Sequence, residues 1–159
     1  MIPITKVNPL NNQENMGTAI DSILRSPFGG AGAAARVDPM TDGAQPQALS
    51  ILVVDDDADV REVIAETLAG FGYGVVQAAS GEEALPVLAE HGDIRMLITD
   101  VRMPGMSGFE LAARARRQTV GLKVIITSGY FLPQPIAERF LKKPFRMHEL
   151  ASAVRAEFG

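Results

Sequence analysis

Short aliphatic runs alternate with segments of helical periodicity throughout residues 50–159 of this chain. The first run, residues 51–54, is unbroken and apolar, as is typical of a strand that is buried on both faces of a parallel sheet. Helical patterns separate the first four runs and follow the fifth, and further strands are expected at 74–78, 96–99, 124–127 and 140–142. The alternation indicates an α/β fold, and we predict a doubly wound parallel sheet of five strands.

The helices between these strands carry their own start signals. Ser80 with Glu83, and Ser107 with Glu110, have the spacing of capping boxes at helix N-termini. A closing helix is predicted from an apolar stripe at i, i+3, i+7 and i+11, formed by Met147, Leu150, Val154 and Phe158.

The residues before the predicted sheet have a different composition. Residues 29–49 are rich in Gly, Ala, Pro and Gln and have almost no large apolar side chain, so we interpret them as a linker. Residues 1–28 place apolar side chains four apart, but Gly17 and Pro27 interrupt the pattern. We predict an N-terminal extension that is disordered or holds a short helix, and one folded domain over residues 50–159.

Charge and composition exclude several classes of function. The chain has 15 basic and 19 acidic residues among 159, a net charge of −4, which argues against a nucleic-acid partner bound through a general basic field. There is no run of about 18 apolar residues and no signal peptide, so we expect a cytoplasmic protein without a membrane partner. Because cysteine is absent, any chemistry must use oxygen and nitrogen groups.

Unusual polar residues follow four of the predicted strands. Asp55 and Asp56 come after the first strand, Asp100 ends the third, Thr127 ends the fourth, and Lys143 follows the fifth. The carboxyl ends of parallel strands meet at one edge of a doubly wound sheet, and ligands bind there. We therefore expect these side chains to form one site.

Three carboxylates at one edge repel one another unless a cation neutralises them. Mg²⁺ suits this role, because it takes carboxylate, water and phosphate oxygens as ligands. A lysine and a hydroxyl at neighbouring strand ends add a point charge and a hydrogen-bond donor for a phosphoryl group. The predicted site therefore binds Mg²⁺ and phosphate, with Asp100 as the nucleophile.

The segments ILVVDDDADVRE, MLITDVRMPGMSG, VIITSG and FLKKPF resemble, in order and spacing, the receiver domain of two-component response regulators, over roughly residues 50–159. The resemblance implies a flavodoxin-like receiver fold. It also implies a signalling protein that takes a phosphoryl group from a histidine kinase or a histidine phosphotransfer protein. Such a domain is not a metabolic enzyme and catalyses only its own phosphorylation and dephosphorylation.

The resemblance assigns roles within the site. Asp100 is the phosphoacceptor and also a Mg²⁺ ligand. Asp56 binds Mg²⁺ directly, whereas Asp55 binds it partly through water. The backbone carbonyl of Arg102 is a further Mg²⁺ ligand. The resemblance also implies that the Thr127 hydroxyl moves toward the phosphoryl group, and that Lys143 is the charge partner of that group. Phe140 is the aromatic residue whose rotamer follows the position of Thr127. The peptide bond between Lys143 and Pro144 is expected to be cis.

One segment departs from the family pattern. Thr127 and Lys143 are only sixteen positions apart, about two helical turns fewer than expected, and Pro133 and Pro135 oppose a regular helix. We expect the fourth helix of the family to be reduced to a turn or two around residues 136–139, or lost, as in shortened receivers of some hybrid kinases and stand-alone regulators. We also hypothesise that Arg102 overhangs the phosphoryl group and influences its hydrolysis.

Other interpretations stay open. Asp55, Asp56 and Asp57 are also suited to a turn and a helix N-cap. A phosphatase of the haloacid dehalogenase type needs an acid at position 102, where this chain has Arg. A nucleotide-binding module needs a glycine-rich motif after the first strand, which is absent. A pseudo-receiver that acts by binding alone, and a receiver fragment of a hybrid histidine kinase, remain as alternatives.

His91 and His148 are assigned structural roles, so the phosphodonor histidine belongs to another protein or to a missing part of a longer chain.

Overall fold

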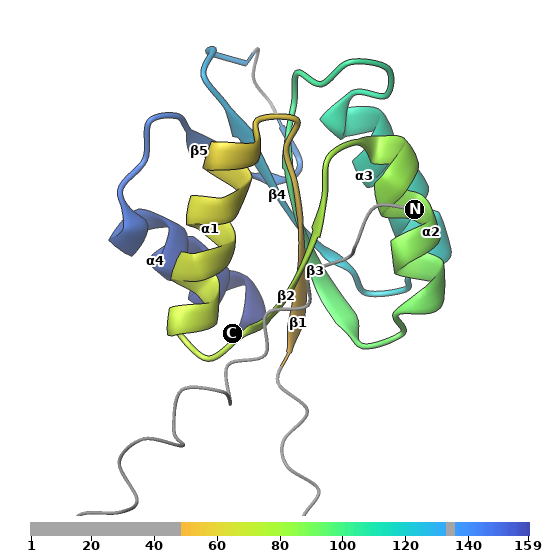
Figure 1. The fold of residues 1–159 in the computed structure, drawn as a ribbon, viewed down its shortest axis with the longest axis horizontal. Helices are drawn as coiled ribbons and strands as arrows, with labels where there is room; N and C mark the ends of the chain where they lie inside the picture. The colour runs from red at the N-terminus through yellow and green to blue at the C-terminus, as the bar shows by residue number, and fades with distance from the viewer. Residues whose placement is uncertain (1–48, 133–135) are drawn as a thin grey trace, which may run out of the picture. The chain divides into compact units, whose positions relative to one another are not determined.

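The structure, a computed structural model, describes residues 49–132 and 136–159. Within them, five parallel strands form one sheet in the order β2-β1-β3-β4-β5 (Figure 1). The elements in chain order are β1 (Ser50–Val54), α1 (Ala58–Gly70), β2 (Gly74–Ala78), α2 (Gly81–Glu90), β3 (Ile94–Asp100), α3 (Gly108–Gln118), β4 (Lys123–Ser128), β5 (Arg139–Lys142) and α4 (Met147–Phe158). The predicted doubly wound five-stranded parallel sheet is confirmed.

The helices cover both faces of the sheet. α1 and α4 lie on one face, and α2 and α3 lie on the other (Figure 1). In β1, Leu52 and Val54 pack in the cluster shared with α2 and α3, while Ile51 and Val53 pack with α1 and α4. Because successive side chains of a strand point to opposite faces, burial on both faces requires the unbroken aliphatic run seen in the sequence.

The order of the strands reverses beside β1. The chain passes from β1 outward to β2, and then crosses to β3 on the other side of β1. In doubly wound sheets, the ligand-binding crevice is expected beyond the carboxyl ends of the strands at such a reversal. Asp55 and Asp100 stand at the carboxyl ends of β1 and β3.

The helix starts follow the predicted capping signals. The Ser80 hydroxyl accepts a hydrogen bond from the Glu83 backbone N–H at 3.2 Å, and the Glu83 carboxylate accepts one from Ala79 N–H at 2.9 Å. The Ser107 hydroxyl likewise accepts from Glu110 N–H at 3.2 Å, whereas the Glu110 carboxylate pairs with Arg114 at 2.6 Å. The Glu83 carboxylate thus binds the residue before the N-cap and not the N-cap itself, so in both helices the serine alone supplies the predicted cap.

The connection from β4 to β5 contains no helix in its described residues, 129–132 and 136–138. The sequence left two outcomes for the fourth helix of the family, and the described residues show no turn of it at positions 136–138. β5 begins at Arg139, one residue earlier than expected. Pro133 and Pro135, the predicted extension over 1–28 and nearly all of the predicted linker over 29–49 lie outside the described residues. No helix among the described residues is long and apolar enough to cross a membrane.

Candidate functional site

The carboxyl ends of four strands meet at one edge of the sheet. Asp55 follows β1, Asp100 ends β3, Thr127 lies one residue before the end of β4, and Lys143 follows β5. The strand register places Asp100 beside Thr127, and Thr127 beside Leu141. Residues that are up to 88 positions apart in the sequence therefore meet at this edge.

Lys143 joins the two buried acids. Its ammonium nitrogen lies 2.5 Å from Asp55 Oδ2 and 3.0 Å from Asp100 Oδ1. Asp55 is 2% exposed and Asp100 is 8% exposed, while the lysine is half-buried. The Lys143 backbone N–H donates to the Ser128 carbonyl at 2.8 Å, and the peptide bond to Pro144 is cis, as the resemblance implies.

The electrostatic state of this trio follows from its burial. Burial raises the pKa of the Asp100 carboxyl above its ordinary value, and the hydrogen bond and charge of Lys143 oppose this shift only in part. Burial alone lowers the pKa of Lys143, but its hydrogen bonds to Asp55 and Asp100 outweigh burial, so the pKa is raised overall. The lysine therefore stays charged at neutral pH and offsets part of the repulsion between the two carboxylates.

The three consecutive acids after β1 have three different environments. Asp55 is buried, Asp56 is exposed, and Asp57 caps α1 by accepting hydrogen bonds from the N–H groups of Asp59 and Val60 at 3.0 and 3.2 Å. The N-cap interpretation is thus correct for Asp57. Its own backbone N–H donates to Asp55 Oδ1 at 3.0 Å, which orients the buried carboxylate.

Arg61 is a contributor that the sequence analysis did not single out. Its guanidinium donates to the Asp55 backbone carbonyl at 2.7 Å and so holds the turn between β1 and α1. Arg61 lies one helical turn after Asp57, where an arginine is usually an exposed surface residue. No motif signals that it turns back toward the strand end.

The site residues suit a hard divalent cation. The described residues contain no group of three or more His, Cys, Asp or Glu side chains close enough to hold a metal, so the three carboxylates expected together are not assembled. Two of them, Asp55 and Asp100, do converge on one ammonium, and the third, Asp56, lies next to Asp55 at the surface. Because Mg²⁺ is usually bound by one or two carboxylates together with waters and phosphate oxygens, this oxygen set fits it.

The loop after Asp100 is tied closely to the strand. Arg102 N–H donates to Asp100 Oδ2 at 2.9 Å, and Val101 N–H donates to the Thr127 carbonyl at 3.0 Å. At the end of the loop, Gly108 N–H donates a hydrogen bond to the Val101 carbonyl at 3.0 Å. A Cβ atom on Gly108 would lie 2.1 Å from the Asp100 carbonyl oxygen, so only glycine allows α3 to start this close to the acceptor.

The two predicted switch residues occupy different layers. Thr127 is 1% exposed at the end of β4, and Phe140 is half-buried on β5, where it packs against the cluster shared with α2 and α3. Arg102 has an exposed side chain whose guanidinium carbon lies 4.4 Å from the ring centroid of Tyr130. Tyr130 stands in the SGY segment, but the sequence alone does not indicate this contact.

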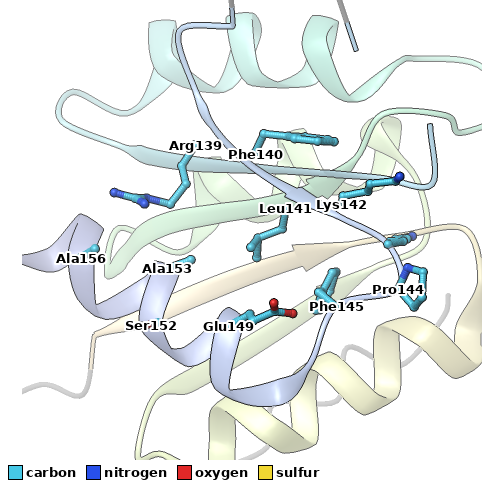
Figure 2. A pocket seen from close by; sticks show the side chains of 11 residues that line it. Arg139, Phe140, Leu141, Lys142, Pro144, Phe145, Glu149, Ser152, Ala153 and Ala156 are labelled. Carbon is cyan, nitrogen blue, oxygen red and sulfur yellow. The ribbon is translucent and has the colours of Figure 1, made fainter. Parts of the chain in front are cut away.

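A cavity of about 710 Å³ lies between β5 and α4. Figure 2 shows Leu141 on β5 directed toward α4, while Phe140 leaves the strand on the opposite side. Glu149 and Ala153 of α4 line the cavity together with Leu141. The cavity adjoins the predicted site through Lys143 and contains neither buried acid.

Comparison with known proteins gives a consistent result. The family model "Response regulator receiver domain" matches residues 51–155. The chain is 36% identical over 114 residues to the Sensor kinase CckA of Brucella abortus, a match that covers 67% of this chain and 12% of the relative. It is 37% identical over 123 residues to the Transcriptional regulatory protein FixJ of Azorhizobium caulinodans, covering 72% of this chain and 57% of the relative. The chain thus spans only part of each of these two relatives.

Solved structures show the same fold. The receiver domain of the hybrid histidine kinase CckA matches with a TM-score of 0.63 at 40% identity, covering 69% of this chain and 99% of that one. The chemotaxis protein CheY4 of Vibrio cholerae matches with a TM-score of 0.64 at 29% identity, covering 69% of this chain and 98% of that one. Since the family model also covers more than half of the residues, the chain belongs to the response regulator receiver family.

Proposed function

We propose that this domain accepts a phosphoryl group on Asp100 from a histidine kinase or a histidine phosphotransfer protein, and signals by the change of conformation that follows. The observation that carries the proposal is the bridge from the Lys143 ammonium to Asp55 at 2.5 Å and to Asp100 at 3.0 Å. It places a fixed positive charge beside the oxygen that would attack phosphorus. Transfer of a phosphoryl group requires mainly positioning and charge neutralisation.

Each residue then has a defined task. An Asp100 carboxylate oxygen forms the bond to phosphorus while the bond from phosphorus to the donor imidazole nitrogen breaks. Lys143 leaves its contact with Asp100 Oδ1 and pairs with a phosphoryl oxygen, and the Thr127 hydroxyl donates to another. Thr127 pairs with Leu141 across the β4–β5 register, and Phe140 is the residue before Leu141, so a movement of Thr127 would reach Phe140 through the backbone of β5.

Mg²⁺ would be held by the carboxylates of Asp55, Asp56 and Asp100 and by the backbone carbonyl of Arg102. When bound, it neutralises the phosphoryl oxygens and the attacking carboxylate. Asp56, as the exposed member of the set, is free to turn toward the ion. Asp55 is oriented in advance by the Asp57 N–H.

Intact mass spectrometry tests the proposal. The full chain is incubated with acetyl phosphate, with and without Mg²⁺, alongside Asp100→Asn. We expect one added phosphoryl group in the wild type, dependent on Mg²⁺ and absent from the variant. A wild type without the added mass that still binds beryllofluoride in the presence of Mg²⁺ would be a receiver restricted to its own kinase. A wild type that does neither would be a pseudo-receiver, and the proposal would be wrong.

The CckA matches support a more specific second candidate, in which these residues are the receiver of a hybrid histidine kinase. The chain covers 12% of the Brucella abortus sensor kinase CckA and 99% of a solved receiver domain from a hybrid histidine kinase CckA. An antibody against residues 50–159 distinguishes the candidates in cells that make the protein. A single band near 17.0 kDa supports a separate receiver, and a much larger polypeptide supports the hybrid kinase.

A further inference from the structure

Arg102 is anchored beside the acceptor, but its guanidinium is turned away from it. The Arg102 backbone N–H is bound to Asp100 Oδ2 at 2.9 Å, so the residue cannot leave the acceptor without breaking this bond. Its guanidinium instead lies over the Tyr130 ring, 4.4 Å from the centroid. Among the described residues, the ion pair of Asp100 is with Lys143 and not with Arg102.

Tyr130 is itself held in place from the neighbouring strand. Its backbone N–H donates at 3.1 Å to the hydroxyl of Ser128, a buried residue at the end of β4. A cavity of about 300 Å³ lies between Tyr130, Arg102 and Leu132. The guanidinium therefore has a defined resting place on the ring and free space in which to move from it.

We propose that Tyr130 is a positioning residue that holds the Arg102 guanidinium away from Asp100 and so shortens the lifetime of a phosphoryl group carried there. The inference rests on the proposed function and deepens it. In the hydrolysis step, a water oxygen bonds to phosphorus, the bond from phosphorus to the Asp100 oxygen breaks to leave the carboxylate, and both water protons leave with the inorganic phosphate. A guanidinium lying across the phosphoryl oxygens obstructs this approach of water, whereas one resting on the ring leaves it open.

The competition between the two resting places sets the size of the effect. A guanidinium binds phosphoryl oxygens through charge-assisted hydrogen bonds, which are strong. An exposed cation–π contact shifts the equilibrium of the guanidinium toward the Tyr130 ring, and away from the phosphoryl oxygens, by a factor of about two to five. Removal of the ring should therefore lengthen the phosphoryl lifetime by a factor of about two to five.

Phe131 supplies a matched control in the next position. It is an exposed aromatic that also carries a cation, because Lys142 Nζ lies 3.6 Å from its ring centroid. Phe131 also lines the cavity beside Arg102, but among the described residues the Arg102 guanidinium stacks on the Tyr130 ring. A general loosening of this segment would follow the loss of either ring, whereas the proposed effect follows the loss of Tyr130 only.

The experiment measures the half-life of the phosphoryl group after excess acetyl phosphate is removed from the full chain. We expect Tyr130→Leu to lengthen the half-life about two- to fivefold, and Tyr130→Phe and Phe131→Leu to match the wild type. In an Arg102→Gln background, Tyr130→Leu should have no further effect, since the guanidinium on which the ring acts is gone. An unchanged half-life in Tyr130→Leu, or an equal change in the Arg102→Gln background, overturns the proposal.

A second measurement does not depend on phosphorylation. The Tyr130 ring should shift the NMR signals of the Arg102 side chain in the unmodified protein, and the shift should vanish in Tyr130→Leu and persist in Phe131→Leu. Absence of the shift in the wild type overturns the proposal. If the wild type is phosphorylated but the half-life of its phosphoryl group does not depend on Tyr130, this inference is wrong and the proposed function stands. A wild type that is neither labelled nor able to bind beryllofluoride with Mg²⁺ defeats the proposed function and this inference with it.

Discussion

The two halves of the site are built on strands with very different support. β1 is buried along all five of its residues and pairs on both sides, with β2 and with β3. β5 has no fully buried residue, pairs with β4 alone, and is reached by a connection whose described residues contain no helix. The acids Asp55 and Asp100 thus stand on the core of the sheet, while Lys143 stands on its edge.

This contrast indicates which half can move. The acids are held by backbone hydrogen bonds and by core strands, so their positions are set whenever the domain is folded. The lysine is held by one backbone hydrogen bond to Ser128 and by the acids themselves. We therefore expect a change in charge at Asp100 to act first on β5 and on the connection before it.

The largest expected difference is between leucines of the two strands. Leu52 of β1 is completely buried, so Leu52→Ala should lower the free energy of unfolding by about 3–4 kcal/mol. Leu141 of β5 is only half-buried, so Leu141→Ala should cost about 1–2 kcal/mol. Urea unfolding monitored by circular dichroism measures both. Equal losses would show that β5 is as firmly packed as β1.

A pair of glycines compares the backbone on the two sides. Gly108→Ala places a Cβ atom 2.1 Å from the Asp100 carbonyl oxygen, and we expect a loss of about 3 kcal/mol because α3 must move. Gly129 follows β4, and a Cβ atom added there would have nothing within 4 Å, so Gly129→Ala is the control, with a change within about 0.5 kcal/mol. Thermal unfolding of both variants checks this. A tolerated Gly108→Ala would show that the acceptor loop is looser than its hydrogen bonds indicate.

The pH dependence of stability tests the burial of the acceptor. Because the pKa of Asp100 is raised in the fold, its ionisation destabilises the folded state as the pH rises from its ordinary value of 3.8 through the raised value. Without Mg²⁺, Asp100→Asn should therefore have a higher Tm than the wild type at neutral pH. The difference should shrink as the pH falls to 3.8 and below. A variant that is less stable at neutral pH would mean that attraction to Lys143 outweighs burial.

The smallest effect concerns the ion pair that ties β5 to the last helix. Arg139 lies 2.7 Å from Glu157, with both side chains partly exposed, and Arg139→Gln should cost about 0.5 kcal/mol at low salt. The loss should nearly disappear in about 1 M salt, which screens exposed charges. Arg114→Gln, which removes a similar pair within α3, is the control. A larger loss for Arg139→Gln than for Arg114→Gln at low salt would show that this pair adds support to the edge strand.

Much of the fold was predictable because local patterns agreed with one another. The buried runs, the capping serines at 80 and 107 and the apolar stripe of α4 each indicated their element. Strand ends were less accurate: β3 begins at Ile94 and β4 at Lys123, earlier than the apolar runs suggested. Backbone pairing extends beyond the apolar residues, since hydrogen bonds between strands do not depend on the side chain.

The meeting of Asp55, Asp100 and Lys143 at one edge of the sheet was predictable, but the geometry of their contacts was not. The order of acids, hydroxyl and lysine along the chain places them at strand ends, and parallel strands bring those ends to one edge. Nothing local distinguishes the buried Asp55 from the exposed Asp56 or from the capping Asp57. Their different environments arise because the chain turns from β1 into α1 at this point, and each residue of the turn faces a different direction.

The linear order of residues is enough to predict the alternating α/β architecture, the receiver family and the placement of Asp55, Asp100 and Lys143 at the carboxyl edge, because these depend on periodicity and on order along the chain. Three contacts emerge only in the folded chain: Lys143 bridges Asp55 and Asp100, Arg61 holds the first turn, and Tyr130 receives Arg102. Contacts of this second kind join residues through directions of side chains that packing alone selects. A linear pattern carries no record of those directions.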